Sequence, residues 1–223
     1  MPISNLSNGL RTGVCTSTNR PTTPYEGQVI YETDTDLSYV YNGTSWQQVS
    51  GGTAVGNSGL VYVTSGTWAS GAITQSFDTT FTSTYTNYRV VINMTASAGD
   101  IAFSAKMRAA TVATSSNYKT LTYNAYPGIG NVAATGSNAA SAFDLGNVSA
   151  VDTVVSFDLY RPQTAKITVL NGMTDNIQSA FSNTIQWFDT KGHLNDTTAY
   201  DGMQFTLGSG TFTGSYTVYG YRQ

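Results

Sequence analysis

The fold is decided by two successive stretches, Tyr88-Arg89-Val90-Val91-Ile92-Asn93-Met94 and Ile101-Ala102-Phe103-Ser104-Ala105-Lys106-Met107. The first is rich in β-branched apolar residues, as buried strands are. The second alternates strictly, which places every second side chain on the same face of a strand. Both stretches therefore predict β-strands that contribute one face to a core.

Similar stretches recur on both sides of this pair, separated by residues that favour turns. They are Leu60–Val63, Ile73–Phe77, Tyr118–Tyr123, Val154–Tyr160, Lys166–Leu170, Ala180–Trp187, Met203–Leu207 and Tyr216–Tyr221. Together these make about ten strands, and no stretch has a convincing helical period. Short antiparallel strands bury one face each when two sheets pack together, so residues 60–223 predict a jelly-roll-like antiparallel β-sandwich. An immunoglobulin-like sandwich is the alternative, disfavoured by the number of strands and the lack of paired cysteines.

Two segments interrupt this pattern. Residues 51–59 are rich in glycine and serine and predict a flexible linker between two domains. Residues 127–150 are rich in alanine, asparagine and serine and predict a long loop, which could clamp a neighbouring subunit. Near the end of the chain, Gly220 predicts a bulge or a close backbone approach in the last strand.

The first 50 residues predict a small structure of their own. Residues 1–18 show no sustained period and predict an irregular arm, and Pro21 and Pro24 keep the following chain extended. Three short strands are then predicted, at Gln28–Glu32, Leu37–Tyr41 and Ser45–Val49. Asn42-Gly43 favours a tight type I′ hairpin turn between the last two. A β-meander this small is marginally stable alone, so we expect it to pack against another copy or another protein.

Two segments of this meander carry a resemblance to a known class of proteins. They are Arg20-Pro21-Thr22-Thr23-Pro24-Tyr25-Glu26-Gly27-Gln28-Val29-Ile30-Tyr31-Glu32-Thr33-Asp34-Thr35 and Tyr39-Val40-Tyr41-Asn42-Gly43-Thr44-Ser45-Trp46. They resemble a module found repeatedly in structural proteins of tailed bacteriophages, namely tail fibres, head fibres and minor virion proteins. The resemblance implies a virion protein and no particular reaction.

The C-terminus carries a second, shorter resemblance. Its residues are Tyr200-Asp201-Gly202-Met203-Gln204-Phe205-Thr206-Leu207 and Gly210-Thr211-Phe212-Thr213-Gly214-Ser215-Tyr216-Thr217-Val218-Tyr219-Gly220-Tyr221-Arg222. These look like the closing strands of β-sandwich domains in phage fibre and virion proteins. Both ends of the chain thus point to the same class of protein.

The two resemblances imply a tail fibre or fibre adaptor of a phage virion. Its N-terminal part would attach it to other virion proteins, and its β-sandwich, as part of a homotrimer, would face the host. A capsid decoration protein or head fibre is the alternative. The residues expected to serve attachment and assembly are Arg20, Pro21, Pro24, Tyr25, Tyr31, Tyr41 and Trp46.

Charged residues are scarce, at 10% of the 223 residues, against roughly 25% in an ordinary soluble domain. The formal net charge is −3 and the 10 lysines and arginines are scattered along the sequence, which argues against nucleic-acid binding. No apolar run approaches the roughly 18 residues of a membrane span. The first residues lack the features of a secretory signal, so we expect synthesis in the host cytoplasm before assembly into the virion.

The sequence offers little for catalysis, and we expect a protein that is not an enzyme and holds no cofactor. His193, the only histidine, is predicted to lie in a polar surface loop, and no nucleophile elbow accompanies it. Cys15, the only cysteine, has no neighbouring base to activate it and no partner for an intrachain disulfide. Glu32, Asp34 and Asp36 alternate as cation ligands could, but a turn bonded by its own Asp side chains is favoured over a metal site.

One enzymatic alternative remains, a polysaccharide-degrading activity. That chemistry needs two carboxylates at a fixed separation. The candidates are Asp175, Asp189, Asp196 and Asp201. Phage enzymes of this kind are usually longer, repetitive chains, and no such repeat occurs here.

Binding of a host-surface glycan is easier to support than its cleavage. Tyrosine, asparagine, serine and threonine adapt to sugars and protein surfaces at low entropic cost. The aromatic residues expected at ligand-contacting positions are Trp187 and Tyr200, with Trp68 and Tyr126 as further candidates. Most aromatic side chains of a β-sandwich fill its interior, which is the competing interpretation for each of them.

Overall fold

The structure is a computed structural model, and it describes residues 12–50, 59–125, 132–178 and 184–222. The chain divides into two compact units, Met1–Asn57 and Ser58–Gln223, and each has sheets of its own. The described residues form strands and no helix, so they contain no helix long and apolar enough to cross a membrane. The predicted all-β fold is confirmed.

The N-terminal unit is the predicted β-meander with one additional strand. β2 (Val29–Glu32), β3 (Leu37–Tyr41) and β4 (Trp46–Ser50) pair antiparallel in chain order. β1 (Gly13–Cys15) runs parallel to β2 and pairs with it. Residues 1–11 of the predicted extended, mostly irregular arm lie outside the described residues, and within the remainder β1 forms the edge of the sheet.

The turn between β3 and β4 also differs from the prediction. It spans residues 42–45, and among them only Gly43 has a positive φ, of 91°. The side-chain oxygen of Asn42 accepts hydrogen bonds from the backbone N–H groups of Thr44 and Ser45, at 3.0 and 2.8 Å. The asparagine side chain thus builds an Asx-type turn in place of the type I′ hairpin.

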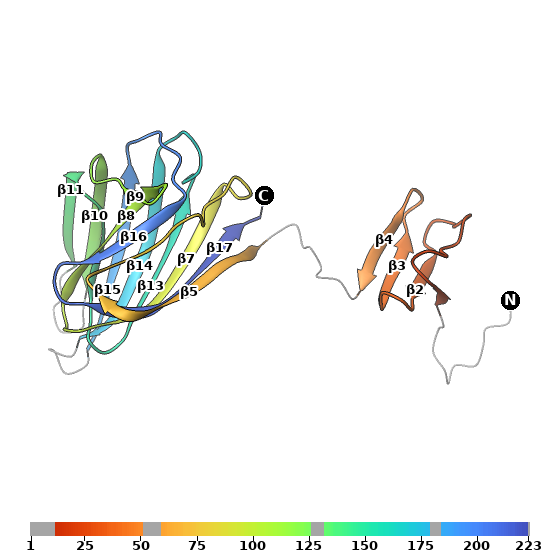
Figure 1. The fold of residues 1–223 in the computed structure, drawn as a ribbon, viewed down its shortest axis with the longest axis horizontal. Helices are drawn as coiled ribbons and strands as arrows, with labels where there is room; N and C mark the ends of the chain where they lie inside the picture. The colour runs from red at the N-terminus through yellow and green to blue at the C-terminus, as the bar shows by residue number, and fades with distance from the viewer. Residues whose placement is uncertain (1–11, 51–58, 126–131, 179–183, 223) are drawn as a thin grey trace. The chain divides into compact units, whose positions relative to one another are not determined.

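The second unit contains a jelly roll of two sheets (Figure 1). One has the strand order β5-β17-β7-β13 and the other the order β6-β16-β8-β12. The strands are β5 (Leu60–Ala72), β6 (Thr74–Phe77), β7 (Asn87–Ala96), β8 (Ile101–Ala109), β12 (Phe143–Val148), β13 (Thr153–Tyr160), β16 (Gly202–Leu207) and β17 (Phe212–Tyr221). Taken in chain order, these eight strands change sheet at every step except from β8 to β12, which is the jelly-roll connectivity. The predicted jelly-roll-like β-sandwich is confirmed.

Four further strands, which we call the extension, continue the first sheet beyond β13 in the order β14-β15-β10-β11 (Figure 1). They are β10 (Tyr118–Ala125), β11 (Ala133–Ala140), β14 (Thr168–Gln178) and β15 (Thr184–Leu194). A short strand, β9 (Val112–Ala113), pairs with β8. β10, β14 and β15 also contact β12 of the other sheet, so the extended sheet curls around that edge of the sandwich.

Three strands of the second unit, β9, β11 and β12, were not predicted, whereas β10, β14 and β15 of the extension correspond to predicted strands. Within residues 127–150, predicted to be a long loop, the described part includes β11 and β12, and residues 126–131 lie outside the described residues. β11 consists of small and polar residues without apolar alternation, so its pairing with β10 rather than local preference makes it a strand. β12 contains the buried Phe143 and Leu145 and pairs with β8, and the loop prediction missed this apolar signal. Residues 51–58 of the predicted linker also lie outside the described residues.

The core of the second unit lies between the two sheets and follows the predicted alternation. Tyr88, Val90 and Ile92 of β7 are fully buried, and Phe103 and Met107 of β8 face them. Aromatic rings dominate this interface, and the largest rings are in mutual contact. The ring of Phe205 lies 5.9 Å from that of Phe103, 5.7 Å from that of Phe77 and 5.5 Å from that of Trp68.

Candidate functional site

The extension turns one face toward the core and the other, the outer face, away from it. Leu170 and Thr174 of β14 and Phe188 of β15 point inward, so the odd-numbered side chains of these two strands point outward. The register of the strands then arranges the outward side chains of β10, β15, β14 and β13 in rows across the sheet. One row is Lys119, His193, Val169 and Tyr160, and the next is Leu121, Lys191, Asn171 and Asp158.

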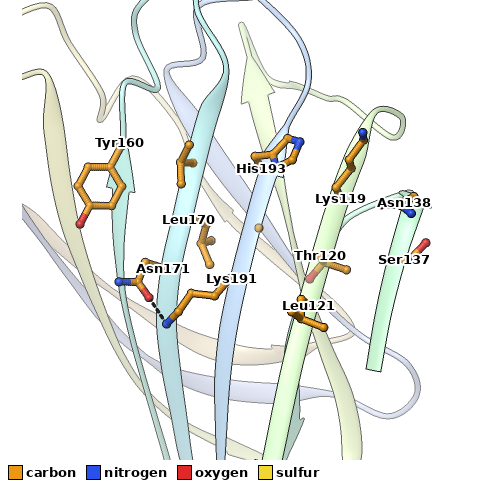
Figure 2. A pocket seen from close by; sticks show the side chains of 12 residues that line it. Lys119, Thr120, Leu121, Ser137, Asn138, Tyr160, Leu170, Asn171, Lys191 and His193 are labelled. Carbon is orange, nitrogen blue, oxygen red and sulfur yellow. Dashed lines mark hydrogen bonds between the residues drawn. The ribbon is translucent and has the colours of Figure 1, made fainter. Parts of the chain in front are cut away.

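A hollow of about 540 Å³ lies over these two rows and the edge strand β11 (Figure 2). Figure 2 shows the side chains of Lys119 and His193 on neighbouring strands at one end of it, with Lys191 hydrogen-bonded to Asn171 at the other. The polar lining consists of Lys119, Thr120, Ser137, Asn138, Tyr160, Asn171, Lys191 and His193. The volume is in the range of small-molecule sites, and the lining is rich in donors.

A second hollow, of about 570 Å³, adjoins the first and shares Val169 and His193 with it. Arg161 and Lys166, from the connection between β13 and β14, line it together with Thr197. Arg161 has a φ of 61°, which is uncommon for a residue other than glycine. Its backbone N–H donates to the carbonyl of Thr86 at 2.9 Å, so this conformation is held in place.

Positive charge is concentrated around the two hollows. Lys119, Lys191, Arg161 and Lys166 are four of the chain's 10 lysines and arginines, and they surround its single histidine. Of these, only Lys191 takes part in an ion pair within the described residues, with Asp189. Basic residues that are scattered in the sequence thus meet in space. No acidic side chain of the described residues lines either hollow, although the formal net charge of the chain is −3.

The acidic side chains of the adjoining rows are already engaged. Lys191 donates hydrogen bonds to the side-chain oxygens of both Asp189 and Asn171. Asp158 accepts a hydrogen bond from the hydroxyl of Tyr221 and lies 3.5 Å from the guanidinium of Arg89. Burial and this bond to Asp158 raise the pKa of Tyr221, so the hydroxyl keeps its proton at neutral pH.

The other end of the outer face is aromatic and apolar. Trp187 of β15 is 37% exposed and lies opposite Asp175 of β14 and Ala125 of β10. Tyr123 and Met173, in the next row, are 38% and 46% exposed and flank Asp189. The prediction that Trp187 is available to a ligand is therefore compatible with its position in the fold.

The other aromatic candidates lie elsewhere. Tyr200 is 2% exposed and packs into the core, and burial raises its pKa. Trp68 is 6% exposed and contacts the rings of Phe212 and Tyr216. Neither can serve as a stacking surface, so the ligand-contacting role predicted for them is wrong. Tyr126 lies outside the described residues.

The prediction that His193 lies in a loop is wrong, because His193 lies near the end of β15. The polar residues around it, Lys191 and Asn195, read as a loop in the sequence. In the structure Lys191 belongs to β15 and Asn195 directly follows it. The polarity of Lys191 and His193 therefore reflects a strand face that is open to solvent, not the absence of a strand. Sequence reasoning also missed Lys119, Tyr160 and Asn171.

The four candidate carboxylates of an enzyme divide into two groups. Asp175 and Asp189 share the outer face, on adjacent strands and one row apart. Asp196 accepts the backbone N–H of Thr198 at 2.6 Å, and hydrogen bonds from the side chain and the backbone of Thr198 lower its pKa. Asp201 accepts the N–H of Ala110 at 3.3 Å. Asp196 therefore binds its local backbone, and Asp201 binds the turn that follows β8.

In the N-terminal unit, two of the predicted attachment residues, Tyr41 and Trp46, contact each other, and Arg20 and Tyr31 contact other residues of the same unit. Arg20 donates to Glu32, and its guanidinium lies 4.4 Å from the centre of the Tyr39 ring. The rings of Tyr41 and Trp46 lie 5.4 Å apart. The hydroxyl of Tyr31 donates to Asp36 at 2.6 Å, Pro21 and Pro24 are half-buried, and Tyr25 is 70% exposed.

The alternating acids of this unit are bound by the protein's own donors. Arg20 and Thr35 donate to Glu32, and Ser17 donates to Asp34 from its N–H and hydroxyl at 2.9 and 2.6 Å. These bonds lower the pKa values of both carboxyls. No group of three or more His, Cys, Asp or Glu side chains in the described part of the chain is placed to hold a metal ion. Cys15 is half-buried in β1, and burial raises the pKa of its thiol, which disfavours the reactive thiolate.

No protein-family model matches the chain, and no curated protein sequence matches it.

Proposed function

We propose that this chain is a non-enzymatic structural protein of a tailed-phage virion, most simply a tail fibre or fibre adaptor. The observation that carries the proposal is the sequence of residues 20–46, which resembles the phage structural module. These residues form the β-meander, which belongs to a compact unit separate from the jelly roll. In this proposal the meander attaches the chain to other virion proteins. The jelly roll, as part of a homotrimer, presents its surface to host glycans.

The composition of the meander supports a role in attachment. Among its described residues only Ile30 and Glu32 are buried, whereas Val14, Tyr25 and Val49 are 58%, 70% and 55% exposed. A sheet of this size without a core of its own is stabilised by a partner surface. Covering exposed apolar side chains would contribute roughly 25 cal/mol per Å² of apolar area buried.

Deletion of residues 1–50 tests this proposal. Phage particles made with the truncated chain are purified on a density gradient and blotted with an antibody against residues 60–223. We expect the truncated chain to be absent from particles while it accumulates in the lysate as a soluble protein. The matched control is Val112→Ser, which alters a residue that is 70% exposed in the second unit, and this variant is expected to be incorporated normally. Normal incorporation of the truncated chain would contradict attachment through the meander.

A polysaccharide-degrading enzyme is the second candidate, favoured by the position of Asp175 and Asp189 on one face beside Trp187. Its test is the release of reducing ends from host polysaccharide by the purified protein, compared with Asp175→Asn and Asp189→Asn variants. We expect no release by any of the three. Release that either substitution abolishes would replace the non-enzymatic proposal.

A further inference from the structure

We infer that the outer face of the extension binds an anionic saccharide chain, with an acidic group in the hollow at Lys119 and His193 and a sugar ring against Trp187. The inference rests on the proposed function only for the source of the saccharide, which would be the host envelope. The binding itself follows from the charges and side chains of this face.

The first argument is charge complementarity. The two contiguous hollows are bordered by Lys119, Lys191, Arg161, Lys166 and His193, while the adjoining Asp158 and Asp189 are already paired with basic groups. Lysine and arginine form their strongest hydrogen bonds with carboxylate and phosphate oxygens. An anionic ligand therefore gains more binding free energy at this end of the face than a neutral ligand does.

The second argument is the kind of polar group that lines the first hollow. Tyr160, Ser137, Asn138 and Asn171 add hydroxyl and amide groups around the two lysines. Such groups both donate and accept hydrogen bonds, as the hydroxyls of a sugar require. A hollow of about 540 Å³ that combines cations with hydroxyls and amides fits an acidic sugar better than a bare inorganic anion.

The third argument is the length of the face. His193 and Trp187 lie on the same strand, β15, and point to the same side. Six residues of an extended strand span about 20 Å. A single sugar cannot reach from the cationic end to the aromatic end, but a chain of several sugars can. Trp187 and Tyr123 offer rigid rings on which the apolar face of a sugar ring can pack.

The test uses the purified full chain and measures binding by calorimetry at 50 and 200 mM salt. The probes are polygalacturonate, which carries carboxylates, poly(glycerol phosphate), which carries phosphates, neutral dextran, and single-stranded oligothymidine. We expect one or both of the first two polymers to bind, with affinity that falls as salt rises, and dextran and oligothymidine to bind at least tenfold more weakly. The stronger of the two anionic polymers identifies the acidic group as carboxylate or phosphate.

Variants locate the binding on the face. Lys119→Gln and Trp187→Ala should each weaken the binding of the polymer about tenfold, which corresponds to a loss of about 1.4 kcal/mol of binding free energy. The matched controls are Lys106→Gln, a lysine on β8 of the other sheet, and Tyr62→Ala, a tyrosine on β5 that is 60% exposed. Both controls should leave the affinity unchanged.

Several outcomes would overturn the inference. These are equal binding of dextran, equal or tighter binding of oligothymidine, no binding of either anionic polymer, or equal effects of the control variants. A loss of oligomeric mass on Trp187→Ala, measured by light scattering, would assign the face to contacts between copies instead. A chain that enters particles but binds neither polyanion would refute this inference alone, and a chain that binds them but is absent from particles would refute only the proposed function.

Discussion

Glu32 is the only charged residue among the buried polar residues of the described chain, and it shows how a few residues hold the small meander together. It accepts hydrogen bonds from Arg20 and, at 2.8 Å, from the hydroxyl of Thr35, while Arg20 rests on the ring of Tyr39. A buried carboxylate without partners would be strongly destabilising. The pair thus links the proline-containing segment to β2 and β3, and it gives the resembling residues Arg20 and Glu32 a structural reason to occur together.

This pair predicts that the N-terminal unit is sensitive to acid. The hydrogen bond from Arg20 lowers the pKa of Glu32 in the folded unit, and Ser17 does the same for Asp34. The stabilisation is fully present above the unfolded pKa values, near 4, and is lost as the pH falls through the lower folded values. We expect the NMR signals of Ile30 and Tyr39 in the full chain to change below pH 4 before that of Ile92 does. In Glu32→Gln the dependence of the Ile30 signal on pH should be reduced, and an unchanged dependence would contradict the role of the pair.

Gly220 provides a second test on a single residue. A Cβ at this position would lie 2.3 Å from ring atoms of Tyr85, so the ring packs directly on the backbone. The pairing of β17 with β5 also shifts register next to this site, between Val218 and Tyr219. The sequence prediction of a close approach or a bulge at Gly220 is therefore confirmed on both counts.

From this contact we expect Gly220→Ala to lower the free energy of unfolding by about 1–3 kcal/mol, the usual effect of overpacking. In a Tyr85→Ala background the same substitution should have an effect near zero, because the obstructing ring is gone. Urea titrations of the four proteins measure this cycle. Equal effects of Gly220→Ala in both backgrounds would show that Tyr85 is not the cause.

At the scale of elements, strands with a clear apolar pattern could be predicted, and β11, which has none, could not. β8 follows from its strict alternation and β7 from its run of β-branched apolar residues, and in both strands alternate side chains are buried. β11 consists of small and polar residues, nearly all exposed, and becomes a strand because β10 offers it a hydrogen-bonding edge. The sequence of this segment does not indicate that β10 will offer such an edge, so the segment alone predicts a loop.

The alternation of β7 can be measured with neighbouring substitutions. Ile92 is fully buried between the sheets, whereas Val91 points to the opposite side and is only half-buried. We expect Ile92→Ala to destabilise the second unit by about 2–5 kcal/mol, through lost apolar burial and the cavity left behind. Val91→Ala should cost less than half as much in the same denaturant titration. Similar losses for the two variants would contradict the assigned inward face.

At the scale of the whole molecule, the jelly roll could be anticipated from the number and kind of strands, but the candidate site could not. The outer face joins Lys119, Tyr160, Asn171 and His193 from strands that are distant in the sequence. These residues lie close together only because the strands are ordered β13-β14-β15-β10 in the sheet. The periodicity of a sequence predicts which face of a strand a residue occupies, but it does not predict which strands are neighbours. Trp187 is exposed and Tyr200 is buried, and the sequence could not separate the two, because an aromatic residue is as typical of a core as of a ligand-contacting surface.

The two units differ in ways that fit the two roles in the proposed function, attachment to the particle and contact with the host. One is a small sheet with few buried residues, suited to completion by a partner, and the other is a jelly roll with a core of its own. A fibre or adaptor needs both, because it must be held by the particle and must also present a stable surface. Location in the particle separates this role from that of a capsid decoration protein or head fibre.

The most direct measurement is immunogold electron microscopy of intact phage particles with an antibody against residues 60–223. The account predicts gold at the tail end or baseplate. Gold spread over the head would contradict the tail-fibre assignment in favour of a decoration or head-fibre protein. The absence of gold from every particle would contradict the assignment to the virion itself.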